Sequence, residues 1–275
     1  MRRIGGTLLV SVLFLVSLSA CRNSSSATSL RTLTITADEY HFHDVPAQLE
    51  GGIVKVEMVN HGQEPHQMQV VRLKDGVSYD QVQQALKQSP EAIFPLVEFV
   101  GGAGVADPGG TSAAILNLQP GQYLLICFIP SPDGVPHLAK GMIAQLQVTA
   151  PKTTSSEPKA SAQITMSDFA YQLPSTLTPG ELVKIANTGS EPHELAIMKL
   201  APGKTVDDLL QWEHSHQGPP PATDVGGMQA LDPGKVGWLQ LPTDKGTYVF
   251  LCNVPDPKRG KAHYDLGMVI QVVLQ

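Results

Sequence analysis

The stretch Gly121-Gln122-Tyr123-Leu124-Leu125-Ile126-Cys127 decides the fold expected for this chain. Tyr123 to Cys127 is apolar without a break, which predicts a buried strand. A loop rich in proline and glycine follows and leads to His137 and then to Gly141-Met142, before alternating residues resume from Ile143 to Val148. One thiol, one imidazole and one thioether therefore lie on or near a single strand–loop–strand unit.

This unit occurs twice in the chain. Gly246-Thr247-Tyr248-Val249-Phe250-Leu251-Cys252 leads into a second proline-rich loop, His263 and Gly267-Met268. An upstream motif is also repeated, because Asn-His-Gly-Gln-Glu-Pro-His ends at His66 and Asn-Thr-Gly-Ser-Glu-Pro-His ends at His193. A nearly constant offset between matching residues over most of the chain indicates an internal duplication, so we interpret the chain as two copies of one domain.

The residue types in each copy point to a metal. A thiolate and an imidazole, completed by a second imidazole from elsewhere and a weak axial thioether, are what a mononuclear blue-copper site needs. Such a ligand set accommodates both oxidation states of copper with little rearrangement, which suits electron transfer. Taken singly, a histidine after proline, a buried methionine or a cysteine in an apolar strand is ordinary packing; taken in matching order twice, they favour copper.

Length, charge and cysteine usage narrow the function further. A chain of 275 residues is long enough for two domains that each bury a core. The net charge is −6 and no cluster of lysine and arginine is present, so we expect no nucleic-acid partner. In an exported chain, Cys127 and Cys252 should be disulfide-bonded, bound to metal or deeply buried. A disulfide between them is not expected, since they occupy equivalent interior strands of different domains.

The N-terminus has the pattern of an export signal. Arg2 and Arg3 precede the apolar segment Leu8 to Leu18, which is short for a membrane span. Leu18-Ser19-Ala20-Cys21 resembles a bacterial lipoprotein signal, so we expect residues 1–20 to be removed and Cys21 to carry lipid. Residues 21–31 would then be a Ser-rich tether, and the protein would lie at the outer face of the bacterial cytoplasmic membrane or in the periplasm. The alternative is an ordinary signal peptide with an incidental cysteine.

Short strands separated by glycine and proline predict an all-β fold of two β-sandwich domains, residues 32–149 and 161–275, joined by a linker over residues 150–160. Each domain is expected to form its own sandwich rather than part of one continuous sheet. A capping box at Ser78 to Gln81 predicts one inserted helix, and Thr205 caps its counterpart. The other expected strands before the organising stretches are Leu33–Thr36, Ile53–Val59, Gln67–Leu73, Ala113–Leu118 and Val236–Leu241.

At this point the motifs resemble a known family. Gly-x-Tyr-x-x-x-Cys followed by His and Gly-Met is similar to the plastocyanin/azurin family of cupredoxins, and so is Asn-x-Gly-x-x-Pro-His. The resemblance implies two tandem Greek-key, cupredoxin-like β-sandwiches with one copper ion at one end of each. It implies these ligands: His66, Cys127, His137 and Met142 in the first domain, and His193, Cys252, His263 and Met268 in the second.

The sequence departs from the family in two places. The loop from cysteine to the second histidine is longer than in the small electron carriers and closer to that of copper nitrite reductase. The residue after the first histidine is Gln67 or Glu194, where the family often has an asparagine that bonds to the cysteine-bearing loop. Both departures bear on the rigidity of the loop and on the reduction potential.

Three functions remain open. The first is a membrane-tethered electron carrier that exchanges electrons with a redox partner protein such as a cytochrome or an oxidase. The second is a copper-handling protein, and the third is a two-domain copper enzyme such as a nitrite reductase or a small oxidase. In those enzymes a histidine beside the cysteine carries electrons to a catalytic copper, whereas here Ile126 and Phe128 flank Cys127. We therefore expect no catalytic copper. His41/His43 and His214/His216 are two His-x-His pairs, fewer than build the trinuclear site of a multicopper oxidase, and we expect His41/His43 to be solvated.

Overall fold

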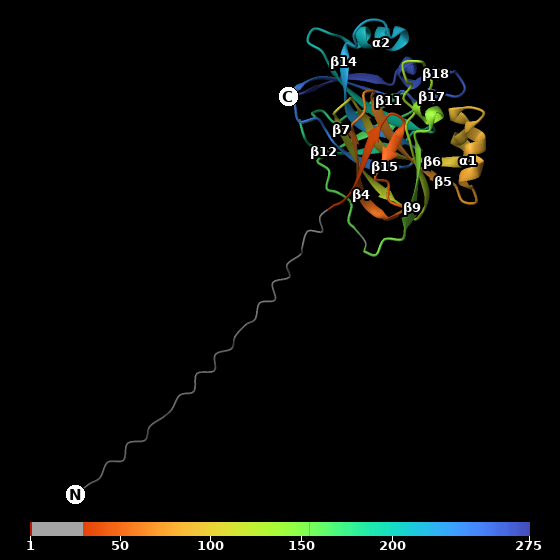
Figure 1. Cartoon of the computed structure of the whole chain (residues 1–275). Coiled ribbons are helices and arrows are strands. Elements are labelled where there is room, and N and C mark those ends of the chain that lie inside the picture. The colour runs from red at the N-terminus through yellow and green to blue at the C-terminus, as the bar shows by residue number, and fades with distance from the viewer. Residues whose placement is uncertain (2–29, 154) are drawn as a thin grey trace.

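The structure is a computed structural model that describes residue 1, residues 30–153 and residues 155–275 (Figure 1). The cleavage site expected after residue 20 and Cys21, the expected site of lipidation, lie outside the described residues. Among the residues that the structure describes, no helix is long and apolar enough to cross a bilayer.

Strands dominate both halves of the chain. The first half contains β1 (Arg31–Asp38), β2 (His41–His43), β3 (Gln48–Glu50), β4 (Gly52–Asn60), β5 (His66–Leu73), α1 (Tyr79–Leu86), the 3-10 helix η1 (Pro90–Leu96), β6 (Val97–Ala106), β7 (Thr111–Leu118), β8 (Gly121–Ile126), η2 (His137–Lys140) and β9 (Ile143–Thr149). The second half contains β10 (Ala162–Ser167), β11 (Ala170–Gln172), β12 (Leu182–Asn187), β13 (His193–Leu200), α2 (Val206–Ser215), β14 (Ala222–Leu231), β15 (Val236–Gln240), β16 (Gly246–Leu251), β17 (Pro255–Asp256), β18 (Lys261–Ala262), η3 (His263–Leu266) and β19 (Val269–Leu274).

Two large sheets pack face to face. One has the strand order β11-β10-β12-β15-β7-β4-β1-β2 and the other β19-β16-β13-β14-β6-β5-β8-β9-β3. Inward-facing side chains of both sheets, such as Ile35 from β1 and Val70 from β5, share one buried apolar core. The predicted all-β fold class is therefore confirmed, and the inserted helices α1 and α2 lie at the periphery of the β-body (Figure 1).

The expectation that the halves would not share a continuous sheet is wrong. β7 pairs antiparallel with β15, its counterpart in the second half, and β6 pairs antiparallel with β14, its counterpart. Because equivalent strands meet, the two halves are joined as the subunits of a two-fold symmetric dimer are. A linker separates the two halves along the chain, but the edge strands of their sheets are free to pair with each other in space.

Glycine explains why β6 and β14 were not expected as strands. Gly101, Gly102 and Gly104 interrupt β6, and glycine in a sequence indicates a turn before it indicates a strand. A Cβ added at Gly104 would lie 2.4 Å from the backbone carbonyl carbon of Gly226 in β14. The glycines therefore permit the close approach of the two backbones that joins the halves.

The helices begin where the capping residues predicted. The Ser78 hydroxyl accepts the backbone N–H of Gln81, and the Gln81 side chain accepts the backbone N–H of Ser78. Thr205 and Asp208 make the same reciprocal pair at α2.

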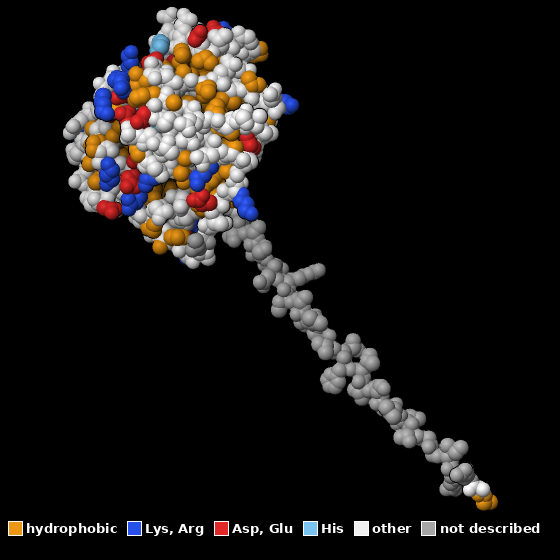
Figure 2. All heavy atoms as spheres, turned by 180° about the vertical axis from the view of Figure 1, so that it is seen from behind, with side chains coloured by type: hydrophobic (Ala, Val, Ile, Leu, Met, Phe, Trp, Pro, Cys, Tyr) orange, Lys and Arg blue, Asp and Glu red, His pale blue; other side chains and the backbone are white. Residues whose placement is uncertain are grey.

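On the face of the molecule seen in Figure 2, lysine and arginine side chains are interspersed with aspartate and glutamate rather than gathered into a basic patch.

Candidate metal centres

Neighbouring strands carry the first histidine and the cysteine of each half, as the sequence predicted. β5 begins at His66 and pairs antiparallel with β8, which ends one residue before Cys127. In the second half β13 begins at His193 and pairs with β16, which ends one residue before Cys252. The register places each histidine and cysteine at the same end of the sandwich.

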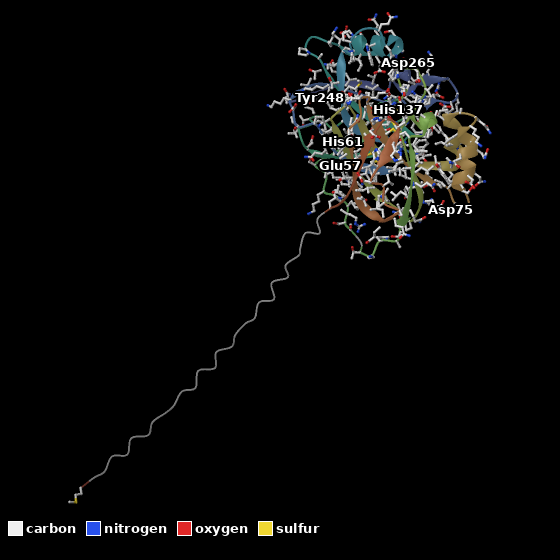
Figure 3. The ribbon with its side chains drawn as sticks, viewed as in Figure 1. Glu57, His61, Asp75, His137, Tyr248 and Asp265 are labelled. Atoms are coloured by element: carbon white, nitrogen blue, oxygen red, sulfur yellow. The ribbon has the colours of Figure 1, made fainter. Side chains whose placement is uncertain are left out.

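A short helix returns the second histidine to that end. In the first half η2 starts at His137, whose backbone N–H donates to the Ile129 carbonyl at 2.8 Å. In the second half η3 starts at His263, whose backbone N–H donates to the Val254 carbonyl at 2.9 Å. Figure 3 shows His137 within the folded body, whereas Asp75 and Asp265 lie at its edges.

The side chains of the first half converge on one point. The Nδ1 atoms of His66 and His137 lie 3.1 Å apart, and the Cys127 sulfur lies 3.4 Å from His137 Nδ1. All three side chains are buried. Nδ1 faces the sulfur in both rings, so Nε2 is free to face outward.

The second half repeats this arrangement closely. The Nδ1 atoms of His193 and His263 lie 3.0 Å apart, and the Cys252 sulfur lies 3.4 Å from His263 Nδ1. The three residues are again buried. The ligand atoms of the two halves thus have nearly the same geometry.

These distances fit a bound metal ion. Two nitrogens about 2.0 Å from a metal and 3.1 Å apart subtend an angle of about 100°. A sulfur about 2.3 Å from the same ion and 3.4 Å from a nitrogen subtends about 105°. A single cation can therefore contact all three ligand atoms of each set, and two imidazoles with a thiolate are the donors that copper takes in blue-copper sites.

Each methionine is held beside the other ligands through its backbone. The Met142 carbonyl accepts the Cys127 N–H at 3.3 Å, and the Met142 N–H donates to the His137 carbonyl at 2.9 Å. Met268 makes the same two bonds, to Cys252 at 3.1 Å and His263 at 2.9 Å. Both methionine side chains are fully buried in the core that contains the cysteines.

The glycine before each methionine serves the backbone conformation of the turn into the last strand. Among the described residues, no atom lies within 4 Å of a Cβ built on Gly141. Both glycines instead have φ of 108°, a conformation that residues with a side chain rarely adopt. The requirement is therefore conformational rather than steric.

Burial keeps both thiols protonated until a cation is present. Burial raises the pKa of the Cys127 thiol to about 12, and it raises the pKa of the Cys252 thiol well above its ordinary value. The backbone N–H of Gln67 lies 3.5 Å from the Cys127 sulfur, and that of Glu194 lies 3.4 Å from the Cys252 sulfur. A metal ion supplies the positive charge that a buried thiolate needs.

Carboxylates contact the outward nitrogens of the histidines. In the first half His137 Nε2 lies 2.9 Å from Glu64 Oε2, and His66 Nε2 lies 3.8 Å from Glu39. In the second half His193 Nε2 lies 2.9 Å from Asp168, and His263 Nε2 lies 3.4 Å from Glu191. At His137 and His193 the distance is that of a hydrogen bond, so the carboxylate there accepts the Nε2 proton, which leaves the Nδ1 lone pair for the metal and fixes the ring.

The pKa values of these groups follow from burial and from the contacts. Burial lowers the pKa of His66 and of His263, and the neighbouring histidine lowers each further. Burial pushes the pKa of Asp168 upward, but hydrogen bonds from Ser190 and His193 outweigh it and hold that pKa well below the usual range. The lowered pKa of His66 and of His263 favours their neutral form, which is the form that binds metal.

The upstream motif builds this carboxylate contact. The Asn60 amide donates to the carbonyls of Glu64 and Ala106, each at 2.8 Å, and its oxygen accepts the Gly62 N–H at 2.8 Å. A Cβ at Gly62 would lie 2.4 Å from the Glu39 carboxylate and 2.9 Å from His66 Nε2. Asn187 and Gly189 repeat the arrangement around Asp168 and His193.

The acidic residues were not found from the sequence. Glu39 and Asp168 lie far from their histidines along the chain, and a lone acidic residue in a turn has no distinctive pattern. Tyr40 and Phe169, the residues that follow them, have φ of 90° and 64°. The repeated acidic residue before an aromatic residue was the one signal available.

The other histidine pairs lie elsewhere. His43, on the edge strand β2, has its Nε2 atom 2.8 Å from Asp38 of β1, and His214 Nε2 lies 2.7 Å from Asp265. Within residues 30–153 and 155–275, the two sets His66/Cys127/His137 and His193/Cys252/His263 are the groups of three that could hold a metal ion. The donor sets thus support copper, one ion per half.

Comparisons with known proteins find solved structures that are similar to this chain. Neither a protein-family model nor a curated protein matches this chain. The chain is similar to the auracyanin from Roseiflexus castenholzii, with 19% identity and a TM-score of 0.30 over 43% of this chain and 96% of that one. It is similar to the copper nitrite reductase from Nitrosomonas europaea, with 15% identity and a TM-score of 0.27 over 89% of this chain and 94% of that one.

A third similar structure is a multicopper oxidase, with 16% identity and a TM-score of 0.26 over 90% of this chain and 89% of that one. The solved structures similar to the chain thus include both a blue copper auracyanin and copper oxidoreductases. At such low identity and TM-score, the case for copper rests on the donor geometry of the two sites.

Proposed function

We propose that the chain is an extracytoplasmic electron carrier with a type 1 copper ion in each half, tethered to the membrane through lipid on Cys21. The observation that carries the proposal is the presence of two buried sets, each with two Nδ1 atoms and one sulfur within about 3.4 Å of a neighbouring ligand. Bound copper supplies one-electron chemistry at each set.

The chain's own residues prepare the sites for electron exchange. Backbone hydrogen bonds tie each methionine to the cysteine and to the second histidine, so the ligands are held before the metal binds. Burial of all three strong ligands excludes water from the metal. A rigid and dry site changes little between oxidation states, which lowers the cost of electron transfer.

The sequence around the cysteines favours a carrier over an enzyme. Ile126 and Phe128 flank Cys127, and Leu251 and Asn253 flank Cys252, so no histidine stands beside either thiol to conduct electrons to another copper. The electrons then leave the protein, and a cytochrome or an oxidase anchored at the same membrane face is the proposed partner.

Copper loading and spectroscopy test this proposal. The purified protein is titrated with Cu(II), the metal is counted, and the visible spectrum is recorded through a reduction and reoxidation cycle. We expect two copper ions per chain with intense thiolate-to-copper absorption that disappears and returns. Copper binding without that absorption would favour copper handling instead, and turnover of nitrite or of a phenol would favour an enzyme.

A further inference from the structure

A cleft of about 1020 Å³ lies between the two halves. Its walls include Phe94 of η1 and Trp212 of α2, together with the loops that follow Cys127 and Cys252. A volume of this size accommodates a small organic molecule. The cleft adjoins the two metal centres, since Glu64, which contacts His137, is one of its lining residues, but the cleft is not needed to explain them.

The cleft is strongly acidic. Among the residues that the structure describes, six carboxylate residues line the cleft and no lysine or arginine does: Glu64, Glu91, Asp107, Glu194, Glu213 and Asp224. Burial, together with the nearby Asp107, Glu213 and Glu194, raises the pKa of Asp224 to about 7. Negative charge is thus crowded in a partly dry space, where a cation is favoured and an anion is excluded.

Aromatic and apolar side chains form the rest of the wall. Phe94 packs edge-to-face on Phe99 with ring centroids 5.0 Å apart, and Phe128 lies 6.4 Å from Phe94 in the same manner. Trp212 lines the cleft from the second half. Such a wall favours an apolar or aromatic body, and aromatic faces also attract positive charge.

Buried polar groups in the cleft offer further contacts. Ser131 is 4% exposed, and its hydroxyl has no hydrogen-bond partner within residues 30–153 and 155–275. Gln229 is 2% exposed and also lines the cleft. A buried hydroxyl without a partner carries a free-energy cost, which a polar group of a bound molecule would offset.

A bare metal ion is not the occupant that this cleft fits. Among the described residues, three metal-ligating side chains come within reach of one another in the two histidine–cysteine sets alone. The carboxylates of the cleft are spread around its wall instead. Dispersed negative charge and a large apolar surface suit an extended organic cation better than a small, strongly hydrated ion.

We propose that this cleft is a binding site for a small organic cation with an aromatic or apolar body, held between the two metal centres. The proposal does not depend on the metals, although Gln67 and Glu194 connect the cleft to them. Both residues line the cleft, and their backbone N–H groups face the sulfurs of Cys127 and Cys252. A bound cation therefore contacts a residue beside each thiol.

A pair of probes of similar shape and opposite charge tests the proposal. Phenethylammonium and phenylpropionate are titrated into the full chain at pH 8, with and without copper, by calorimetry and by tryptophan fluorescence. Trp212 lines the cleft, whereas Trp238 is buried and is not one of the residues lining the cleft, so Trp212 reports on the site. We expect one phenethylammonium per chain and at least about tenfold weaker binding of phenylpropionate.

Variants locate the site. Asp224→Asn and Glu213→Gln should each weaken phenethylammonium binding by about tenfold, while Asp75→Asn, a surface change remote from the cleft, should leave it unchanged. Trp212→Phe should remove the fluorescence change but keep the calorimetric signal, and circular dichroism checks that each variant is folded. Equal binding of the two probes, or binding that survives both carboxylate changes, would overturn the proposal.

Discussion

The two metal centres share their ligands but reverse the pairing of carboxylate to histidine. In the first half the close carboxylate, Glu64, contacts the second histidine at 2.9 Å. In the second half the close carboxylate, Asp168, contacts the first histidine at 2.9 Å. The metal-facing atoms have kept one geometry after duplication, whereas the hydrogen bonds on the outer side have diverged. The ligand set is therefore the constrained part, and the outer bonds are free to set different potentials.

The surroundings of the second histidine differ as well. Tyr40 packs on His137 and its hydroxyl donates to Glu64, while Lys140 contacts the same hydroxyl. In the second half Phe169 packs on His263 and has no hydroxyl to offer. Hydrogen-bonded polar side chains thus cover the second histidine of the first centre. The aromatic ring of Phe169 covers that of the second centre, and Arg259 stacks on this ring.

The largest expected effect is the loss of visible absorption at one metal centre with no loss at the other. Cys127→Ser should abolish the visible absorption of the first copper and leave that of the second, and Cys252→Ser should do the reverse, because charge-transfer colour needs the thiolate. Each variant should keep half the absorption of the copper-loaded protein, measured at equal concentration. If either single change removed all of the colour, the two centres would not be independent.

A second comparison concerns the glycines that let the strands of each half pack. A Cβ at Gly102 would lie 1.9 Å from the Met68 carbonyl oxygen, and one at Gly227 would lie 2.1 Å from that of Leu195. Gly102→Ala and Gly227→Ala should each lower the free energy of unfolding by about 3 kcal/mol in denaturant titrations.

The control for these glycines is Gly76→Ala. Gly76 also has a positive φ, of 83°, but no atom lies within 4 Å of an added Cβ. It should therefore cost only about 1 kcal/mol, the conformational part of the effect. A loss at Gly102 or Gly227 no larger than that at Gly76 would contradict the close backbone contact.

A third comparison concerns equivalent positions in β6 and β14. Phe99 pairs with Val71 in the first half, and Asp224 pairs with the equivalent Met198 in the second. The folded pKa of Asp224, about 7, is above its unfolded value, so the folded chain holds the proton more tightly. The contribution of the Asp224 carboxyl to the free energy of unfolding is fully present below about pH 4, and it is lost as the pH rises through 7.

Replacing the Asp224 carboxyl should remove the loss of stability that its ionisation causes at high pH. Asp224→Asn should raise the free energy of unfolding by about 2 kcal/mol at pH 8, since solvent in the cleft screens part of the full shift, and by little at pH 4. Chemical denaturation at both pH values measures the difference. An equal effect at the two pH values would show that ionisation of Asp224 is not the cause.

The smallest expected effect, a change in how readily each copper is reduced, tests the reversed pairing of carboxylate to histidine. Glu64→Gln should favour reduction of the first copper by roughly 1 kcal/mol, because a negative charge near the metal is removed, and Asp168→Asn should do the same for the second. The more distant Glu39→Gln and Glu191→Gln serve as matched controls in a redox titration. Larger shifts from the controls than from Glu64 and Asp168 would contradict the assigned pairing.

Much of this architecture could be predicted because it depends on local patterns. The buried strand before Cys127, the capping boxes at Ser78 and Thr205 and the repeated Pro-His motif are each specified by a few adjacent residues. The glycines of β6 and β14 were misleading, because a glycine that serves close backbone packing has the same sequence pattern as one that serves a turn.

The parts of the site that were missed depend on contacts between distant segments. Asp168 reaches His193 only because a tight turn presents it, and Glu64 reaches His137 across 73 positions of sequence. The pairing of β7 with β15 likewise arises from the shape of the assembled sheets. Neither periodicity nor motif spacing within one segment carries that information.

The most direct test of the account is to locate the metal by anomalous X-ray diffraction from crystals of the copper-loaded protein at the copper absorption edge. We expect two peaks per chain, one between His66, Cys127 and His137 and one between His193, Cys252 and His263, each with a methionine sulfur farther away. Peaks at His41/His43 or at His214/His216, with none at the cysteines, would contradict the account.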